Sequence, residues 1–288
     1  MNILITGCKG QLGTEIGKIA GNDSLHHWFF TDVDTLDICD ADAVERYFDI
    51  NGIEACINCA AYTAVDKAED EPELALKINA KAPETLAKAC LKHHALLVHV
   101  STDYVFDGNG SSPYTEDEPV APQSVYGSTK AEGERLIRQS GCSHFIVRTA
   151  WLYSSTGKNF VKTMLSLADT RDNINVVCDQ KGTPTWAYDL AEMLVHLVNQ
   201  NGTSHVQETF HFTNEGVITW YDFTVAIMEI AHKDCKVTPI TTDQYPAKAH
   251  RPAYSVLDKT KIKAYTKREI PAWRDSLVKC IAELQEKR

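Results

Sequence analysis

Three glycines near the N-terminus constrain the fold of this chain more than any other feature. Gly7, Gly10 and Gly13 follow a short apolar run, residues 3–6, and open an amphipathic segment, residues 11–19, that predicts a helix. Glycines at a strand-to-helix turn let the backbone approach a pyrophosphate, and the helix N-terminus offers free N–H groups to that anion. The spacing GxxGxxG is one residue longer in its first step than GxGxxG. Its place between the first strand and the first helix favours dinucleotide binding over a purely structural turn.

The first 150 residues alternate short apolar runs with amphipathic segments. We predict strands at residues 3–6, 28–31, 55–59, 96–101 and 144–149, and helices at residues 11–19, 40–50, 72–93 and 125–139, with Asp40 as a cap and Pro83 as a point where the third helix divides or kinks. This order indicates right-handed βαβ crossovers and a Rossmann-like, doubly wound parallel sheet.

The alternation loosens after residue 150. Helices are expected at residues 159–168, 187–199, 219–231 and 273–286, and strands at residues 174–178 and 209–213. We therefore predict a dinucleotide-binding domain over residues 1–150 and a smaller α/β substrate-binding cap over residues 151–288, with some segments of the second part returning to the first domain. The cleft between them should lie beyond the carboxyl ends of the strands.

Composition and charge exclude several classes of protein. The chain of 288 residues has 29 Lys and Arg against 39 Asp and Glu, a net charge of −10 that disfavours nucleic acid as a partner. No apolar run approaches the roughly 20 residues that span a bilayer, and the N-terminus lacks the features of a signal peptide. Nine scattered cysteines fit reduced thiols in the cytoplasm. Cys56 and Cys59 should point to opposite faces of a strand, which favours core packing over a redox pair.

An aspartate follows the second predicted strand at the place where a ribose would be bound. Asp32 can accept hydrogen bonds from the adenosine ribose hydroxyls and disfavours a 2′-phosphate, although a solvated turn explains it too, since Asp34 and Asp37 follow. Lys9, inside the glycine loop, would offset this bias by pairing with a phosphate. These residues favour NADH mildly and leave NADPH open.

A YxxxK element starts the predicted helix at residues 125–139. Tyr126 and Lys130 share one helix face, so the ammonium can lie beside the phenol and, with an oxidised nicotinamide, lower its pKa. Such a phenol can donate a proton to a carbonyl while hydride arrives from the cofactor. Exposed YxxxK pairs are common, but Thr102, where another strand ends, can hydrogen-bond the substrate oxygen. The glycine loop, Thr102, Tyr126 and Lys130 together therefore predict a reductase.

With these residues in order, the chain resembles the extended short-chain dehydrogenase/reductases and, within them, the dTDP-4-dehydrorhamnose reductases. The matching segments are residues 7–13, 58–66, 101–108, 126–130, 148–151, 179–185 and 251–252. The resemblance implies reduction of the C4 ketone of dTDP-4-dehydro-L-rhamnose to dTDP-L-rhamnose. We expect NADPH as cofactor, with NADH also plausible, a nucleotide-sugar substrate, no nucleic-acid or membrane partner, and a homodimer as one open assembly.

The same resemblance implies roles for individual residues. The cofactor would be bound by Gly7, Gly10, Gln11, Leu12, Gly13, Asp32, Asp37, Ile38, Ala61, Tyr62, Thr63, Tyr126 and Lys130. Asp103 and Trp151 would join Thr102 against the sugar, with core packing as the alternative for Trp151. Some relatives dimerise through a metal held by acidic side chains; only Glu15 matches that pattern, so we predict no metal.

Two other functions stay open. A 4,6-dehydratase uses a Thr-Asp-Glu run, but this chain has Thr102-Asp103-Tyr104, which favours simple reduction. A nucleotide-sugar epimerase can use Tyr126 and Lys130 alone, without net consumption of NADPH. Related chains also act as non-catalytic, NADP-binding regulatory subunits of methionine adenosyltransferase.

Overall fold

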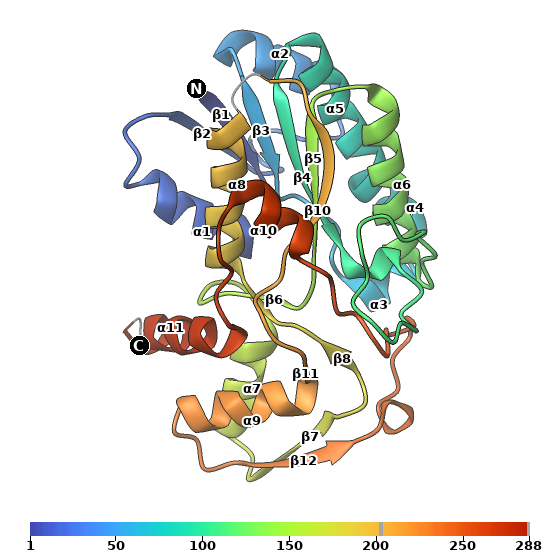
Figure 1. Ribbon diagram of the computed structural model, residues 1–288, viewed down its shortest axis with the longest axis vertical. Coiled ribbons are helices and arrows are strands. Elements are labelled where there is room, and N and C mark those ends of the chain that lie inside the picture. The colour runs from blue at the N-terminus through green and yellow to red at the C-terminus, as the bar shows by residue number, and fades with distance from the viewer. Residues whose placement is uncertain (202–203, 287–288) are drawn as a thin grey trace.

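A six-stranded parallel sheet forms the centre of the computed structural model, which describes residues 1–201 and 204–286 (Figure 1). The strand order is β10-β5-β4-β3-β1-β2, and every pair is parallel. The strands are β1 (Asn2–Thr6), β2 (His27–Thr31), β3 (Ala55–Asn58), β4 (Leu96–Thr102), β5 (His144–Thr149) and β10 (Gln207–His211). The order reverses between β1 and β3, which confirms the predicted doubly wound sheet and places the expected ligand crevice at the ends of these two strands.

Helices cover both faces of the sheet (Figure 1). One face packs against α1 (Gln11–Ala20), α8 (Ala187–Asn201) and α10 (Thr260–Thr266), and the other against α2 (Ala41–Asn51), α5 (Ala82–Lys92) and α6 (Val125–Ser140). Cys56 belongs to the second core and Cys59 packs against the first, as the strand geometry predicts. Burial raises the pKa of both thiols, so neither is an activated nucleophile.

The helix predicted over residues 72–93 is continuous but changes type along its length. It consists of α4 (Pro72–Leu76), a π-helical segment η1 (Lys77–Lys81) and α5, and Pro83 lies in the first turn of α5, directly after the π-helical segment. The π-helical segment carries Asn79, whose side chain accepts from the N–H of Tyr62 and donates to its carbonyl. The loop that follows β3 is thereby fixed to the helix beside it.

The remaining elements form a smaller layer below the sheet in Figure 1. They are β6 (Leu152–Tyr153), α7 (Phe160–Ala168), β7 (Asn173–Val177), β8 (Lys181–Gly182), β9 (Thr185–Trp186), β11 (Ile218–Thr219), α9 (Trp220–Ile230), β12 (Lys236–Ile240) and α11 (Trp273–Glu286). Their own core includes Tyr153, Trp186, Phe223 and Leu277. Because α8, β10 and α10 lie against the large sheet, the chain passes between the two layers more than once. Division into two domains at residue 150 stays a prediction.

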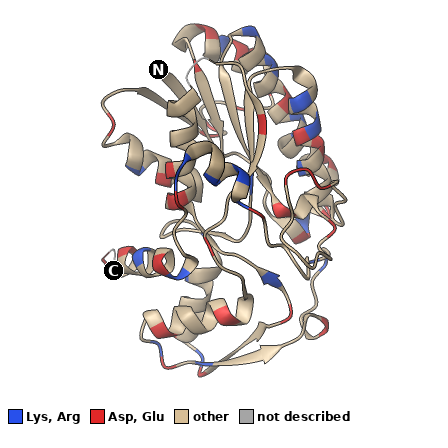
Figure 2. Cartoon of the chain, in the orientation of Figure 1, with Lys and Arg blue, Asp and Glu red and all other residues tan. Residues whose placement is uncertain are grey.

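Short helical segments flank the crevice: α3 (Val65–Ala68), η2 (Asp103–Val105) and η3 (Thr242–Gln244). Figure 2 shows basic and acidic residues intermixed along the outer helices rather than gathered into one basic face. None of the described helices is long and apolar enough to cross a membrane.

Candidate active site

The glycine loop between β1 and α1 is shaped by two close backbone approaches. Gly7 has a φ of 64°, and a Cβ on it would lie 2.8 Å from the backbone of Ala60, at the end of β3. A Cβ on Gly13 would lie 2.5 Å from Cys8 Cα. Gly10, the N-cap of α1, has no side chain to cap the helix, and the described part of the chain offers no acceptor to the N–H groups of residues 11–13. Those free donors fit a pyrophosphate.

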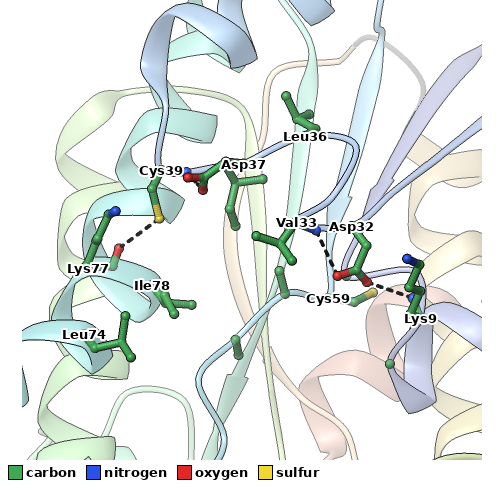
Figure 3. A pocket seen from close by; sticks show the side chains of 15 residues that line it. Lys9, Asp32, Val33, Leu36, Asp37, Cys39, Cys59, Leu74, Lys77 and Ile78 are labelled. Carbon is green, nitrogen blue, oxygen red and sulfur yellow. Dashed lines mark hydrogen bonds between the residues drawn. The ribbon is translucent and has the colours of Figure 1, made fainter. Parts of the chain in front are cut away.

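A cavity of about 500 Å³ begins at this loop and follows the end of β2 (Figure 3). Asp32 lies on one side, where its carboxylate accepts from the N–H groups of Lys9 at 3.0 Å and Val33 at 2.9 Å. Leu74 and Ile78 lie on the opposite side. An apolar slot with a fixed carboxylate at its mouth suits a nucleoside. The predicted residues Gly7, Gly10, Asp32, Asp37, Ile38 and Ala61 all line it.

The charge of Lys9 is already paired in this structure. Its Nζ lies 2.7 Å from Asp34 Oδ2, and this contact raises the pKa of Lys9 and lowers that of Asp34. A phosphate near Lys9 would therefore have to compete with Asp34 for the ammonium.

Two more cavities continue the first one towards the smaller layer. The middle cavity, of about 440 Å³, shares Gly7, Gly10, Cys59 and Ala61 with the first and contains Gln11, Leu12, Gly13, Thr63, Thr102, Tyr126 and Lys130. The third, of about 480 Å³, shares Thr63, Val65, Asp103, Tyr104, Trp151 and Leu152 with the middle one. The shared walls join the three into one row, with the predicted catalytic residues in the middle.

The first turns of α6 hold the predicted proton donor. Ser124 caps this helix by accepting from the N–H of Gly127 at 3.1 Å, and Tyr126 and Lys130 both face the middle cavity from successive turns. Burial raises the pKa of Tyr126, and a hydrogen bond with Thr102 offsets this only in part. A phenol in this environment keeps its proton at neutral pH.

Lys130 makes no hydrogen bond to the phenol of Tyr126 within the described residues, although both side chains line the middle cavity. Lys130 Nζ donates to the carbonyl of Val100 at 2.6 Å and lies 3.2 Å from His99 Nε2. Burial lowers the pKa of Lys130 to about 8, against an opposing effect of the Glu134 carboxylate. The hydrogen-bond partners of Lys130 thus come from β4, and burial of the phenol raises the pKa of Tyr126.

Asp103 occupies the wall between the middle and third cavities. Its Oδ1 accepts from the Thr102 hydroxyl at 2.9 Å, while Oδ2 has no hydrogen-bond partner among the described residues. Only 4% of the residue is exposed, and burial raises the pKa of its carboxyl to about 6. An unpartnered oxygen in this wall suits a polar group of a ligand.

Trp151 fits both interpretations that the sequence left open, contact with the substrate and core packing. Its φ is 48°, and its indole stacks on that of Trp220 with ring centroids 3.5 Å apart, yet it also lines the middle and third cavities. A Cβ on Gly182 would lie 2.6 Å from the indole, so this glycine leaves room for the ring. Trp151 thus forms part of a packed aromatic wall that faces the crevice.

Several residues that line the third cavity were not predicted from the sequence. The third cavity is also lined by Tyr104, Phe160, Trp220, Tyr245 and Arg251. Arg251 donates to Asp66 Oδ2 at 2.6 Å and to the Tyr104 hydroxyl at 3.1 Å, which joins the segment after β12 to α3 and η2. The only local signal was the pair Arg251-Pro252 in a polar loop.

Tyr62 is the predicted cofactor residue that lies apart from this row. Ala61 and Thr63 line the cavities, but Tyr62 is absent from their walls, and its hydroxyl donates to Glu71 Oε2 at 2.6 Å. Successive side chains of this loop point in different directions. The side chain of Tyr62 points towards the start of α4, where its hydroxyl contacts Glu71.

A buried ion pair supports the same end of the sheet. Arg148 Nε and Nη2 donate to the two carboxylate oxygens of Glu134 at 2.9 and 2.7 Å, and the Ser101 hydroxyl donates to Glu134 at 2.6 Å. Glu134 is fully buried and Arg148 is 2% exposed. The pair ties α6 to β4 and β5 close to Lys130. The helical spacing of Tyr126, Lys130 and Glu134 was the signal that could have found it.

Two acidic residues outside the cavities that could be considered for a metal, Glu15 and Glu45, already have cationic partners. Glu15, the residue considered for a metal, lies 2.5 Å from Lys18 Nζ. Glu45, Asp49 and His93 form a cluster of potential ligands on α2 and at the end of α5, but Lys92 Nζ lies 2.5 Å from Glu45.

Comparison with known proteins gives consistent matches over the whole chain. The family model described as RmlD substrate binding domain matches residues 1–286. A dTDP-4-dehydrorhamnose reductase of Aggregatibacter actinomycetemcomitans is 42% identical over 268 residues, which cover 90% of this chain and 91% of the relative. The crystal structure of a dTDP-4-dehydrorhamnose reductase from Clostridium acetobutylicum has a TM-score of 0.94 at 45% identity and covers 99% of this chain and 100% of its own. That of a Bacillus anthracis reductase in complex with NADP has a TM-score of 0.92 at 35% identity, covering 98% and 99%.

Proposed function

Because this chain belongs to the RmlD substrate binding domain family, we propose that it is a dTDP-4-dehydrorhamnose reductase, which reduces the C4 ketone of dTDP-4-dehydro-L-rhamnose with NADPH. The observation that carries this proposal is the row of three cavities. A cavity suited to a nucleoside and a free helix N-terminus lie at one end, an aromatic and polar cavity lies at the other, and Thr102, Tyr126 and Lys130 lie where the two meet.

The residues of the first two cavities fit a dinucleotide. The free N–H groups of residues 11–13 would hold the pyrophosphate, Asp32 the adenosine ribose, and Leu36, Leu74 and Ile78 the adenine. Lys9 would leave Asp34 to meet a 2′-phosphate, and this exchange would allow NADPH despite Asp32. When bound, the reduced nicotinamide supplies a hydride to the ketone carbon.

The chain's own residues complete the reduction. Tyr126 would donate its phenolic proton to the ketone oxygen, which becomes the hydroxyl of the product. Its raised pKa keeps that proton in place before the reaction. Thr102 would orient the ketone oxygen, and Asp103 and the stacked pair Trp151 and Trp220 would contact the sugar.

An assay of turnover tests the proposal directly. Purified protein with NADPH and dTDP-4-dehydro-L-rhamnose should lose the absorbance of the reduced nicotinamide, with one product formed for each NADPH consumed. Substrates that carry UDP or GDP, and NADH in place of NADPH, belong in the same series. Conversion of a nucleotide sugar without consumption of NADPH would instead support an epimerase. Cofactor binding with no conversion of any sugar would support a regulatory subunit.

We also propose that the enzyme works in the cytoplasm, where its nine free cysteines would stay reduced. Homodimerisation stays a prediction.

A further inference from the structure

A chain of buried polar side chains runs behind Lys130, from β1 through β3 and β4 to α6. The Thr6 hydroxyl donates to Asn58 Oδ1 at 2.7 Å, Asn58 Nδ2 lies 3.0 Å from His99 Nδ1, and His99 Nε2 lies 3.2 Å from Lys130 Nζ. None of these four residues is more than 2% exposed. Since buried polar groups need hydrogen-bond partners, the donors and acceptors along this chain must alternate.

The orientation of Asn58 fixes the tautomer of His99. Asn58 Oδ1 accepts from the backbone N–H of Ala60 at 3.1 Å, and a backbone N–H can only donate. The amide nitrogen of Asn58 is therefore the atom that faces His99, and it too can only donate. His99 Nδ1 must accept this hydrogen bond, so the single proton of the neutral ring lies on Nε2. A doubly protonated ring is disfavoured, because burial and the charges of Lys130 and His144 hold the pKa of His99 well below its usual value.

His99 consequently presents an N–H donor to Lys130. An ammonium group has three donors and no acceptor, whereas a neutral amine has a lone pair that can accept. We propose that His99 is a positioning residue that stabilises the neutral amine of Lys130 by donating its Nε2–H to Nζ. The amine can still donate to the carbonyl of Val100, 2.6 Å away.

The other groups around Lys130 have opposing effects on its pKa. Burial also favours the amine, whereas the carboxylate of Glu134, one turn further along α6, favours the ammonium. The effect of Glu134 is limited because Arg148 and Arg138 pair with it. Tyr126 and Asp103 face the same cavity, whereas His144 on β5 only disfavours the protonated form of His99. His99 is the one of these groups that donates a hydrogen bond to Nζ.

The consequence for rate rests on the proposed function. A charged Lys130 makes the nearby phenol a stronger acid, and its neutral form makes Tyr126 a weaker proton donor. Ketone reduction should then slow as the pH rises through the pKa of Lys130. By stabilising the amine, His99 moves this decline to lower pH than burial alone would set.

The tautomer can be tested without turnover. Protein labelled with 15N-histidine, free of cofactor, is studied by NMR at alkaline pH, and the His99 resonances are identified by their loss in His99→Gln. We expect a proton on Nε2 and none on Nδ1. A proton on Nδ1, alone or with one on Nε2, would overturn the inference. This readout is independent of whether the protein reduces any sugar.

The second test measures the pKa of Lys130. The pH dependence of the Lys130 13Cε resonance reports this pKa, and the resonance is assigned by its disappearance in Lys130→Met. In His99→Gln the amide oxygen can accept from the ammonium, so the pKa of Lys130 should rise by about one pH unit or more. Asn58→Asp should act in the same direction, because its carboxylate accepts from Nδ1–H and frees Nε2 as an acceptor. Its negative charge also raises the pKa of Lys130, so the proton on Nδ1 of His99 is measured in this variant as well. Asn58→Asp serves if His99→Gln does not fold.

His144→Gln is the matched control, since this buried histidine on β5 bonds to the carbonyl of Cys142 and makes no hydrogen bond to Lys130 within the described residues. It should leave the pKa of Lys130 nearly unchanged. With turnover established, the alkaline limb of kcat should move upward in His99→Gln and Asn58→Asp alone. An unmoved pKa in both variants, or an equal shift in the control, would refute the role of His99.

Discussion

A pair of glycine substitutions on α1, one turn apart, separates the phosphate loop from the helix that carries it. A Cβ at Gly13 would lie 2.5 Å from Cys8 Cα and 2.6 Å from the carbonyl oxygen of Gly7. Both atoms belong to the backbone, so no side-chain rotation relieves the overlap. A Cβ at Gly17 would meet only the ring edge of Phe30, at 3.9 Å.

The magnitudes follow from these distances. Ordinary contact begins at 3.4 Å, so Gly13→Ala must displace the loop by about an ångström. Overpacking of this kind costs about 1–3 kcal/mol, against a gain of up to about 1 kcal/mol from replacing a helical glycine. The displacement also moves the N–H groups of residues 11–13. Loss of one hydrogen bond to a charged phosphate, about 1.5–3 kcal/mol, weakens cofactor binding about 10- to 100-fold.

Gly17→Ala, the matched control, gains the higher helix propensity of alanine without the steric overlap. It should stabilise the protein by up to about 1 kcal/mol and raise Tm by up to about 2 °C, with cofactor affinity unchanged. Urea denaturation measures the stability of both variants, and titration with NADPH, followed by fluorescence, measures Kd. If Gly13→Ala bound NADPH as tightly as Gly17→Ala does, the loop would not be the pyrophosphate site and the reasoning would be refuted.

Three further substitutions test the cavity and its support. Tyr126→Phe should retain cofactor affinity and lose about 10²- to 10⁴-fold in kcat, since only the proton donor is removed; near-normal turnover would exclude Tyr126 as the acid. The pKa of Asp103 is raised to about 6 from 3.8, so the folded state holds this proton more tightly and wild-type stability falls as pH rises from about 4 to about 6. Asp103→Asn should therefore be more stable than wild type above pH 6, by up to about 3 kcal/mol, with the difference vanishing below pH 4 in urea titrations; a pH-independent difference would contradict this. Glu134→Gln leaves Arg148 buried without its ion pair and should cost about 3–5 kcal/mol, whereas Glu132→Gln, which breaks an exposed pair with Arg135 on the same helix, should cost less than about 1 kcal/mol; equal losses in denaturant midpoints would refute the assignment.

The periodic part of the fold was predictable from the sequence. Strands β1 to β5 and helices α1, α2 and α6 lie within a few residues of their predicted ranges, because each contributes apolar side chains to the cores on the two faces of the sheet. Strands β6, β8, β9 and β11 have two residues each and carry no period to detect. The segment that became β10 was predicted two residues too late, and its pairing with β5 depends on the path of the whole chain.

The stacked indoles show a second limit. Trp151 follows β5 and Trp220 opens α9, and no local pattern relates the two positions. Their contact exists because the smaller layer folds back against the end of the large sheet. Sequence alone could assign Trp151 to the crevice by its place after a strand, but it could not supply the second ring.

The protonation states of the site residues were harder to predict than which residues form the site. Parallel strands end at one edge of a sheet, so residues after β1, β3, β4 and β5 meet there whatever the loops do, and this rule alone brings Gly7, Ala61, Thr102 and Trp151 together. Which groups hold protons depends instead on the partners behind them. Lys130 lies where the YxxxK spacing predicts, yet β4 gives it a carbonyl and a histidine in place of the phenol. A pattern along one helix specifies only the side chains on that helix. The charge of Lys130, and with it the acidity of Tyr126, is therefore decided by residues from strands that the motif does not contain.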